Sequence, residues 1–327
     1  MEVAGIKAVV IGGGTGSFML LKSLKNYVTD ITALVNMADD GGSTGILRDE
    51  LGVLPPGDVR QCLVALSNEP QVRDLFNYRF EEGTFEGHAF GNILMAALEK
   101  MTGSFTEGVE VASRILNITG KVEPVLLNNV TLCMKTKSGS VSTGEYEIAH
   151  ADFASSKPEL WLEPDPEVNP EAVAAIEEAN MIVIAPGNLY GSLAPALITP
   201  EISTAIRTSK ARKIFVSNLV TKPGQTDKFK VHDFADEIER FVGGECLDYV
   251  LYNNVEPSAD LLKTYASQGE FGVEFDHDAF SAAHYEAVGA NLIGEIFQTS
   301  KKDIIKRTLI RHDSDVVARQ IMRIYFA

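Results

Sequence analysis

A buried-strand pattern followed directly by a glycine cluster constrains this chain most. Residues Ile6 to Ile11 form a short, continuous apolar run, and Gly12-Gly13-Gly14-Thr15-Gly16 follows it at once. A continuous run of this length is typical of a strand covered on both faces of a parallel sheet. Residues Ser17 to Tyr27 then read as a helix. This strand–loop–helix unit predicts an α/β fold.

The same unit recurs along the chain. Further strands are expected at Ile31 to Val35, Met181 to Ala185, Lys213 to Ser217, Tyr249 to Tyr252 and Asp303 to Ile310. Helices are expected at Asp58 to Ser67, with Asp58 as the cap, and at Gly87 to Met101, Thr106 to Leu116, Glu171 to Ala179 and Asp315 to Ile324. Because strands alternate with helices, we expect one domain over residues 1–327 with a Rossmann-like, doubly wound, mostly parallel sheet.

Residues 125–164 depart from this pattern. Val130 to Thr136 and Val141 to Ile148 alternate apolar and polar residues around Lys137-Ser138-Gly139-Ser140. Alternation on both sides of a short glycine-containing turn indicates a β-hairpin. We therefore expect an inserted antiparallel element here.

Charge and composition exclude several classes of function. The chain has 327 residues with 29 basic and 45 acidic side chains, a net charge of −16. Such a surface repels nucleic acids and anionic membranes. No apolar run approaches the roughly 18 residues of a membrane span, and only four apolar residues follow Lys7 before the glycines, too few for a signal-peptide core. We expect a cytoplasmic protein without nucleic-acid binding or membrane insertion, and the three separated cysteines imply neither disulfides nor zinc.

Four polar loops follow predicted strands. They are Gly12 to Gly16, Asp39 to Gly45, Gly187 to Ser192, and Asn218 to Thr226. The carboxyl ends of parallel strands meet at one edge of a sheet, where ligands of such folds bind. We expect the four loops to share one crevice that holds an extended dinucleotide or nucleotide-sugar ligand.

The first of these loops is suited to an anion. Bare amides of Gly12, Gly13, Gly14, Thr15 and Gly16 beside a helix N-terminus can cradle a phosphate. The loop does not complete G-x-G-x-x-G, because Ser17 stands where the third glycine would be, and it lacks the P-loop lysine. An NAD-dependent oxidoreductase is therefore the weakest interpretation, and a tight turn without ligand stays open.

The second loop carries two adjacent carboxylates. Asp39 or Asp40 can ligate Mg²⁺ or accept from ribose hydroxyls. The amides of Gly41, Gly42 and Ser43 offer a second anion site. A solvated Asp-Gly turn is the alternative. Asn36, at the end of the preceding strand, is either a ligand contact or a terminator.

The last two loops offer polar groups of several kinds. Gly187 and Asn188 supply backbone amides, Tyr190 and Ser192 supply hydroxyls, and Asn218 opens a loop that includes Lys222-Pro223-Gly224-Gln225-Thr226. Each loop alone is also compatible with ordinary turn chemistry.

Four further side chains are candidates for ligand contact. Arg60, expected in a first helical turn, is unfavourable to the helix dipole unless an anion lies nearby. His88 and Asn92, four residues apart on a predicted helix, share a face that can grip a phosphate, sugar or base. Arg311 follows the last predicted strand and can bind a diphosphate bidentately, with Ser314 capping the next helix. Surface ion pairs and a structural histidine are the alternatives.

Six of these motifs occur in the order seen in a known family. They are residues 12–16, 39–43, 55–60 (Pro-Pro-Gly-Asp-Val-Arg), 88–92 (His-Ala-Phe-Gly-Asn), 186–190 and 223–226. In this order the chain resembles the gluconeogenesis factor (YvcK-type) family from Lys7 to about Ala318. That family is similar in turn to 2-phospho-L-lactate transferase.

The resemblance implies a Rossmann-like fold, a cytoplasmic location and a nucleotide diphosphate ligand such as a UDP-sugar or NAD. It also implies a regulatory role linked to cell shape and wall metabolism during gluconeogenic growth. The transferase relatives use Mg²⁺ to move a phospholactyl group from a guanosine diphosphate-type donor, and Asp39 and Asp40 match their metal-associated motif. The chain departs from the family pattern at Ala38, Asn188, Gly191 and Lys222.

Two functions therefore remain open. One is a nucleotide-sugar-binding or dinucleotide-binding regulatory protein without turnover. The other is a Mg²⁺-dependent phospho-ester transferase, in which carboxylate-bound Mg²⁺ and the glycine loops stabilise the transferred group. A homodimer is a further open expectation.

Overall fold

The main sheet has seven parallel strands in the order β10-β9-β8-β7-β1-β2-β3. The computed structural model describes residues 5–153, 157–267, 269–294 and 311–327, so the strand expected at Asp303 to Ile310 lies outside the described residues. The strands are β1 (Lys7–Gly12), β2 (Asp30–Val35), β3 (Lys121–Pro124), β7 (Met181–Ile184), β8 (Arg212–Val216), β9 (Tyr249–Asn253) and β10 (Glu286–Ala290). This arrangement confirms the predicted Rossmann-like α/β fold.

Strand β1 lies inside the sheet between β2 and β7. Val10 pairs with Ala33 on one side and with Val183 on the other. All residues of β1 after Lys7 are buried. Helices therefore cover both faces, which is why the sequence shows a continuous apolar run rather than alternation.

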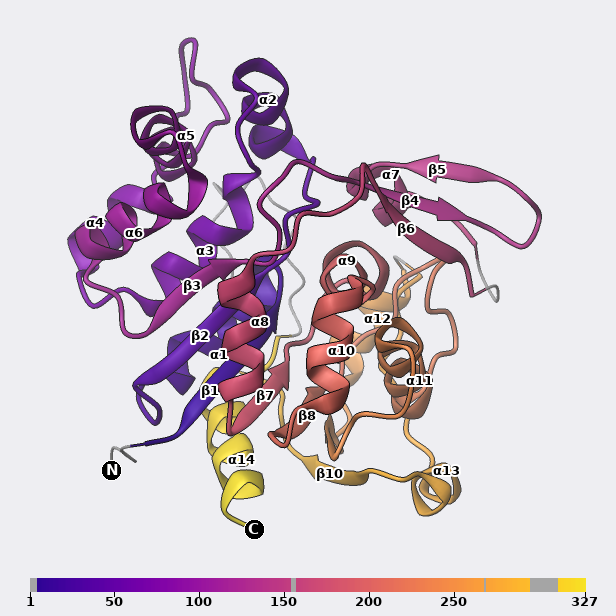
Figure 1. Ribbon diagram of the computed structural model, residues 1–327. Coiled ribbons are helices and arrows are strands. Elements are labelled where there is room, and N and C mark those ends of the chain that lie inside the picture. Colours follow the sequence, from indigo (N-terminus) through magenta and orange to yellow (C-terminus); the bar gives the residue numbers. More distant parts are fainter. Residues whose placement is uncertain (1–4, 154–156, 268, 295–310) are drawn as a thin grey trace.

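The direction of winding reverses at β1. The chain passes from β1 through α1 (Gly14–Leu24) to β2, whereas α10 (Pro200–Thr208) leads from β7 to β8 on the other side of β1. Because such crossovers are right-handed, the two helices cover opposite faces. Figure 1 shows α10 on the near side with α8 (Pro170–Glu178) and α11 (Val231–Val242).

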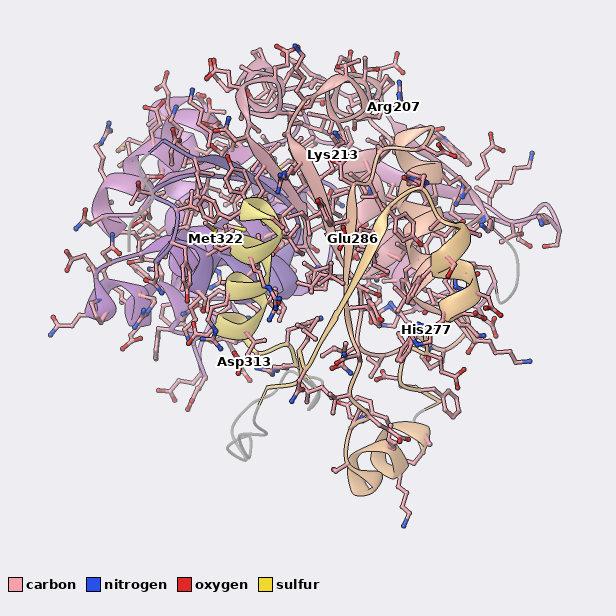
Figure 2. All side chains as sticks on the ribbon, turned by 90° about the horizontal axis from the view of Figure 1, so that it is seen from below. Arg207, Lys213, His277, Glu286, Asp313 and Met322 are labelled. Carbon is pink, nitrogen blue, oxygen red and sulfur yellow. The ribbon has the colours of Figure 1, made fainter. Side chains whose placement is uncertain are left out.

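The remaining helices pack around the sheet and the helices that cover its two faces. Apart from a short helix in the inserted element, they are α2 (Gly42–Leu51), α3 (Pro56–Leu66), α4 (Pro70–Asn77), α5 (Phe90–Thr102), α6 (Phe105–Leu116), the π-helix η1 (Leu189–Leu193), α9 (Ala194–Leu197), α12 (Ala259–Ala266), α13 (His277–Ala282) and α14 (Ser314–Phe326). Helix α14 packs against α1. Figure 2, a view from below, shows Asp313 at the start of α14 and Met322 further along it.

The inserted element is a small antiparallel sheet. Its strands are β4 (Thr131–Lys135), β5 (Val141–Thr143) and β6 (Glu159–Glu163), in the order β5-β4-β6. The hairpin of β4 and β5 confirms the prediction, but its second strand stops at Thr143. Gly144 has a φ of +97°, and a short helix, α7 (Glu145–His150), follows. Figure 1 shows this sheet projecting from the body of the molecule, with α7 at its base.

Several predicted helix starts are wrong. Helix α3 starts at Pro56 after the cap Pro55, so Asp58 lies inside the first turn and is not the cap. A proline at the first helical position is favourable because its missing N–H would be unpaired there anyway. Arg60 consequently lies in the second turn.

Two other starts differ for similar local reasons. Helix α5 begins at Phe90, so His88 precedes it and does not share a helix face with Asn92. Asp313, not Ser314, caps α14, because its carboxylate accepts the N–H groups of Asp315 and Val316, each at 2.9 Å.

No helix in the described ranges is long and apolar enough to cross a bilayer. Cys62, Cys133 and Cys246 are all buried and unbonded to one another.

Candidate functional site

A cavity of about 370 Å³ lies at the carboxyl ends of β1, β7 and β8. The predicted residues in its wall are Thr15, Gly16, Gly187, Asn188, Asn218 and Arg311. The cavity therefore joins three of the four predicted loops. It lies where the winding of the sheet reverses, which is the usual ligand position in open α/β sheets.

Close backbone contact joins the first loop to the third. A Cβ atom at Gly16 would lie 1.6 Å from the carbonyl oxygen of Pro186, so no side chain fits there. Asn218 Nδ2 donates to the Gly187 carbonyl at 2.8 Å and thereby ties the fourth loop to the third. Asn188 Oδ1 accepts the Gly191 N–H at 3.3 Å. The shape of the cavity is therefore fixed by short polar contacts among the loops themselves.

Lys222 is a cation in the cavity wall that was not among the residues predicted to contact a ligand. Within the described ranges its ammonium group makes no hydrogen bond or ion pair. Burial lowers the pKa of Lys222, while the charges of Glu145 and Glu270 act in the opposite direction. A half-buried cation without a close partner is a suitable contact for an anionic ligand group.

Hydrogen-bond acceptors line the same cavity. Asn218 Oδ1, Gln225 Oε1 and Glu270 Oε2 are buried, and within the described part of the chain they have no partner. His312 Nε2 lies 3.0 Å from the Ser217 carbonyl. A carbonyl only accepts, so Nε2 carries the hydrogen and Nδ1 is left as an acceptor. Burial lowers the pKa of His312 to about 4, so the ring is neutral at pH 7.

An unexpected carboxyl group contacts the first glycine loop. Asp58 accepts the Gly14 N–H, and a Cβ at Gly13 would lie 2.4 Å from Asp58 Oδ2. Burial and then the charges of Asp39 and Glu145 raise the pKa of Asp58 to about 8. The Gly14 amide, which was predicted to bind a ligand phosphate, therefore donates to a carboxyl group of the chain itself.

Asp39, Asp40, Asp58 and Glu145 form an acidic cluster beside the cavity. Burial raises the pKa of Asp39, and it raises the pKa of Glu145 to about 7 with added repulsion from Asp39 and Asp40. Carboxylate oxygens are the ligands that Mg²⁺ prefers, and a divalent cation would relieve this mutual repulsion. The donor chemistry therefore fits Mg²⁺, although among the described residues no three such groups converge as a ready metal site.

Ser43, His88, Asn92 and Arg60 form a hydrogen-bonded network even though His88 is not helical. His88 Nδ1 lies 2.9 Å from Ser43 Oγ, and Asn92 Nδ2 donates to the same hydroxyl at 3.3 Å. Arg60 Nε donates to Asn92 Oδ1, and its Nη1 to Asn77 Oδ1, both at 2.8 Å. Arg60 is buried and is bound to side chains of the chain itself rather than exposed at a helix start.

Three residues predicted to contact a ligand contact other parts of the chain instead. Tyr190 is buried, its hydroxyl donates to Glu237 Oε2 at 3.2 Å, and it is not in the cavity wall. Asn36 is also buried, where its Oδ1 accepts the Ala38 N–H at 3.0 Å. Ser192 lies against Gly13.

Comparison with known proteins gives a consistent assignment. Residues 8–293 match the family described as 2-phospho-L-lactate transferase CofD. A Clostridium acetobutylicum protein is 40% identical over 97% of this chain and 69% of its own length. The gluconeogenesis factor of Bacillus subtilis is 36% identical over 95% of this chain and 96% of its own.

A solved structure agrees with the fold. The crystal structure of a UPF0052 family member from Bacillus halodurans superposes with a TM-score of 0.88 at 35% identity and covers 98% of this chain and all of that one. The chain therefore belongs to the CofD family, and it is similar over nearly its whole length to gluconeogenesis factors.

Proposed function

We propose that this chain is a cytoplasmic regulatory protein of the gluconeogenesis-factor type that binds a nucleoside diphosphate compound, either a UDP-sugar or an NAD-like dinucleotide. On this proposal its role is linked to cell shape and wall metabolism. The observation that supports it is the cavity of about 370 Å³ at the reversal point of the sheet, where three polar loops meet.

The cavity wall offers both cations and hydrogen-bond acceptors to such a ligand. Lys222 and Arg311 are cations beside the start of α1, where a helix N-terminus also favours negative charge. Asn218, Gln225 and neutral His312 offer acceptors for sugar hydroxyls or base N–H groups.

Mg²⁺ is part of this proposal. Asp39 and Asp40 are the candidate ligands, and Asp58 and Glu145 add further carboxyl groups close to Asp39. When bound, the ion supplies positive charge that neutralises a diphosphate. The chain's own part is to keep several carboxyl groups close together at the edge of the cavity.

Thermal unfolding with added nucleotides tests the proposal. UDP-glucose and NAD are compared with UMP and uridine, with and without Mg²⁺. At a ligand concentration about 100 times Kd, the free energy of unfolding rises by about 2.7 kcal/mol. We expect this gain from at least one diphosphate and a smaller one from the monophosphate. The proposal fails if no diphosphate stabilises the protein.

A Mg²⁺-dependent phospho-ester transferase is the second candidate, supported by the acidic cluster beside the cavity and by the family description. Phosphoryl-type transfer depends mainly on positioning and charge, so the missing general base does not exclude it. Phosphorus NMR with a guanosine diphosphate-type donor and Mg²⁺ separates the two functions. The mixture also contains an alcohol as acceptor. Release of nucleoside monophosphate together with a new phosphodiester signal on the acceptor establishes transfer, whereas an unchanged donor spectrum supports binding alone.

A further inference from the structure

Helix α7 is too short to be stable by its own hydrogen bonds. It has six residues, Glu145–His150, and lies in the chain between β5 and β6, two strands of the small sheet. The first four N–H and last four C=O groups of any helix lack partners within the helix. In a six-residue helix almost every residue belongs to one of these two ends, so few hydrogen bonds form within the helix. Groups elsewhere in the chain therefore decide whether it forms.

The first turn of α7 is capped by a side chain from a distant loop. Asp40 Oδ1 accepts the Tyr146 N–H at 2.8 Å, across 106 residues of chain. A Cβ at Gly144 would lie 2.6 Å from Asp40 Oδ2, so the glycine there permits the approach. Asp40 acts on α7 as an N-cap side chain normally acts on its own helix.

The last turn is capped in the same way from another loop. Gln225 Nε2 donates to the carbonyls of Ile148 at 2.8 Å and Ala151 at 3.2 Å. Gln225 is buried and lies in the cavity wall. Next to it, the Phe153 N–H donates to the Gly224 carbonyl at 2.7 Å.

The position of α7 determines the position of Glu145. Its carboxyl group is close to Gly191, because a Cβ there would lie 2.3 Å from Glu145 Oε1. Electrostatic interactions connect the same group with Asp39 and Asp40 on one side and with Lys222 on the other. Glu145 is thus the residue of α7 that belongs to the acidic cluster and lies at the cavity edge.

We propose that Asp40 and Gln225 are positioning residues that hold α7 at its two ends and so place Glu145 beside Asp39 and Asp58, close to Lys222 in the cavity wall. In this role Asp40 uses the ability of one carboxylate oxygen to accept an N–H bond, which does not depend on its charge. This differs from a role as a metal ligand, for which the charge is essential. The assignment rests on contacts within the chain and does not require the proposed ligand.

Hydrogen exchange of the full chain without nucleotide or metal tests the proposal. Asp40→Ala and Gln225→Leu are each expected to speed exchange of the amides of residues 146–151 at least 5-fold. Asp40→Asn retains an accepting oxygen and is expected to keep wild-type exchange. Asp49→Ala removes an exposed carboxylate on α2 and serves as the matched control. Exchange elsewhere in the chain reports whether each variant is folded.

The outcomes are distinct. Unchanged exchange at residues 146–151 in Asp40→Ala overturns the positioning role, and equal loss of protection in Asp40→Asn and Asp40→Ala does so too. Failure of every nucleotide to bind wild type would contradict the proposed function and leave these results unaffected.

Discussion

Individual charged side chains decide what the crevice can hold. The acidic cluster contains Asp58, whose pKa is raised to about 8, and Glu145, whose pKa is raised to about 7. Lys222 and Arg311 supply positive charge in the cavity wall. A phosphate is therefore favoured on the cationic side, and beside the carboxyl groups only with a counter-cation.

Arg311 gives the first test at this scale. A guanidinium that contacts a bound diphosphate makes charge-assisted bonds, so Arg311→Ala is expected to weaken binding by about 2 kcal/mol or more, roughly 30-fold in Kd. Calorimetry with UDP-glucose or NAD measures the change. Arg323→Ala, on the exposed side of α14, is the control and should leave Kd unaltered. A loss under about 1 kcal/mol would assign Arg311 to an ordinary ion pair.

The buried His312 predicts that the free energy of unfolding depends on pH. Burial lowers its pKa in the folded state to about 4, below the ordinary value of 6.5. The unfolded chain therefore takes up a proton before the folded chain does, and stability falls as the pH drops from about 6.5 to about 4. The loss from this group is at most about 3 kcal/mol.

Urea unfolding between pH 4 and pH 7 measures this effect. His312→Gln, whose amide can donate to the Ser217 carbonyl, should flatten the dependence in that interval. His277→Gln, on α13, is the matched control and should keep the wild-type slope. The interpretation is wrong if both variants retain the same slope as the wild type.

The same residues show what sequence could and could not predict. Asn188 and Asn218 were predictable because they follow β7 and β8, and parallel strands end at one edge. The strand expected before Arg311 lies outside the described residues. Asp58 was predicted only as a helix cap, because its contact with Gly13 joins residues 45 apart and depends on how α3 packs on α1. Glu145 carried no signal, since α7 exists only through caps supplied from elsewhere.

At the scale of elements, the loops were easier to predict than the starts of helices. Continuous apolar runs mark β1, β7 and β8 because burial on both faces demands them. Helix starts depend on one or two residues: Pro56 moved the start of α3, and part of the predicted Asp39 to Gly45 loop is the first turn of α2. Strand β6 was missed because Leu162 is the one buried residue among its five, so no continuous apolar run marks it.

Gly16→Ala tests the contact between two of these elements. The added methyl group would meet the Pro186 carbonyl at 1.6 Å, so the loops after β1 and β7 must separate. We expect the free energy of unfolding to fall by about 3 kcal/mol, as for other severe steric clashes. Chemical denaturation measures it. Gly272→Ala, whose added atom would lie 3.8 Å from its nearest neighbour, should cost under about 1 kcal/mol. Equal losses would contradict the close approach.

At the scale of the whole molecule, net charge opposes the proposed ligand. The chain carries a charge of −16, and a nucleoside diphosphate is also an anion. Long-range repulsion slows the approach of like charges, whereas contacts inside the cavity determine how long the ligand stays. The two effects therefore separate into association and dissociation rates.

Salt should consequently accelerate binding. The screening length falls to about 10 Å at 0.1 M salt, so the repulsion at a distance weakens while short contacts inside the cavity persist. Stopped-flow measurements with UDP-glucose are expected to show an association rate about 2-fold or more higher at 200 mM than at 20 mM salt, with a smaller change in dissociation. Uridine, which is uncharged, is the control and should show no such rise. An association rate that falls with salt would mean that Lys222 and Arg311 create a locally positive entrance strong enough to outweigh the charge of the whole protein.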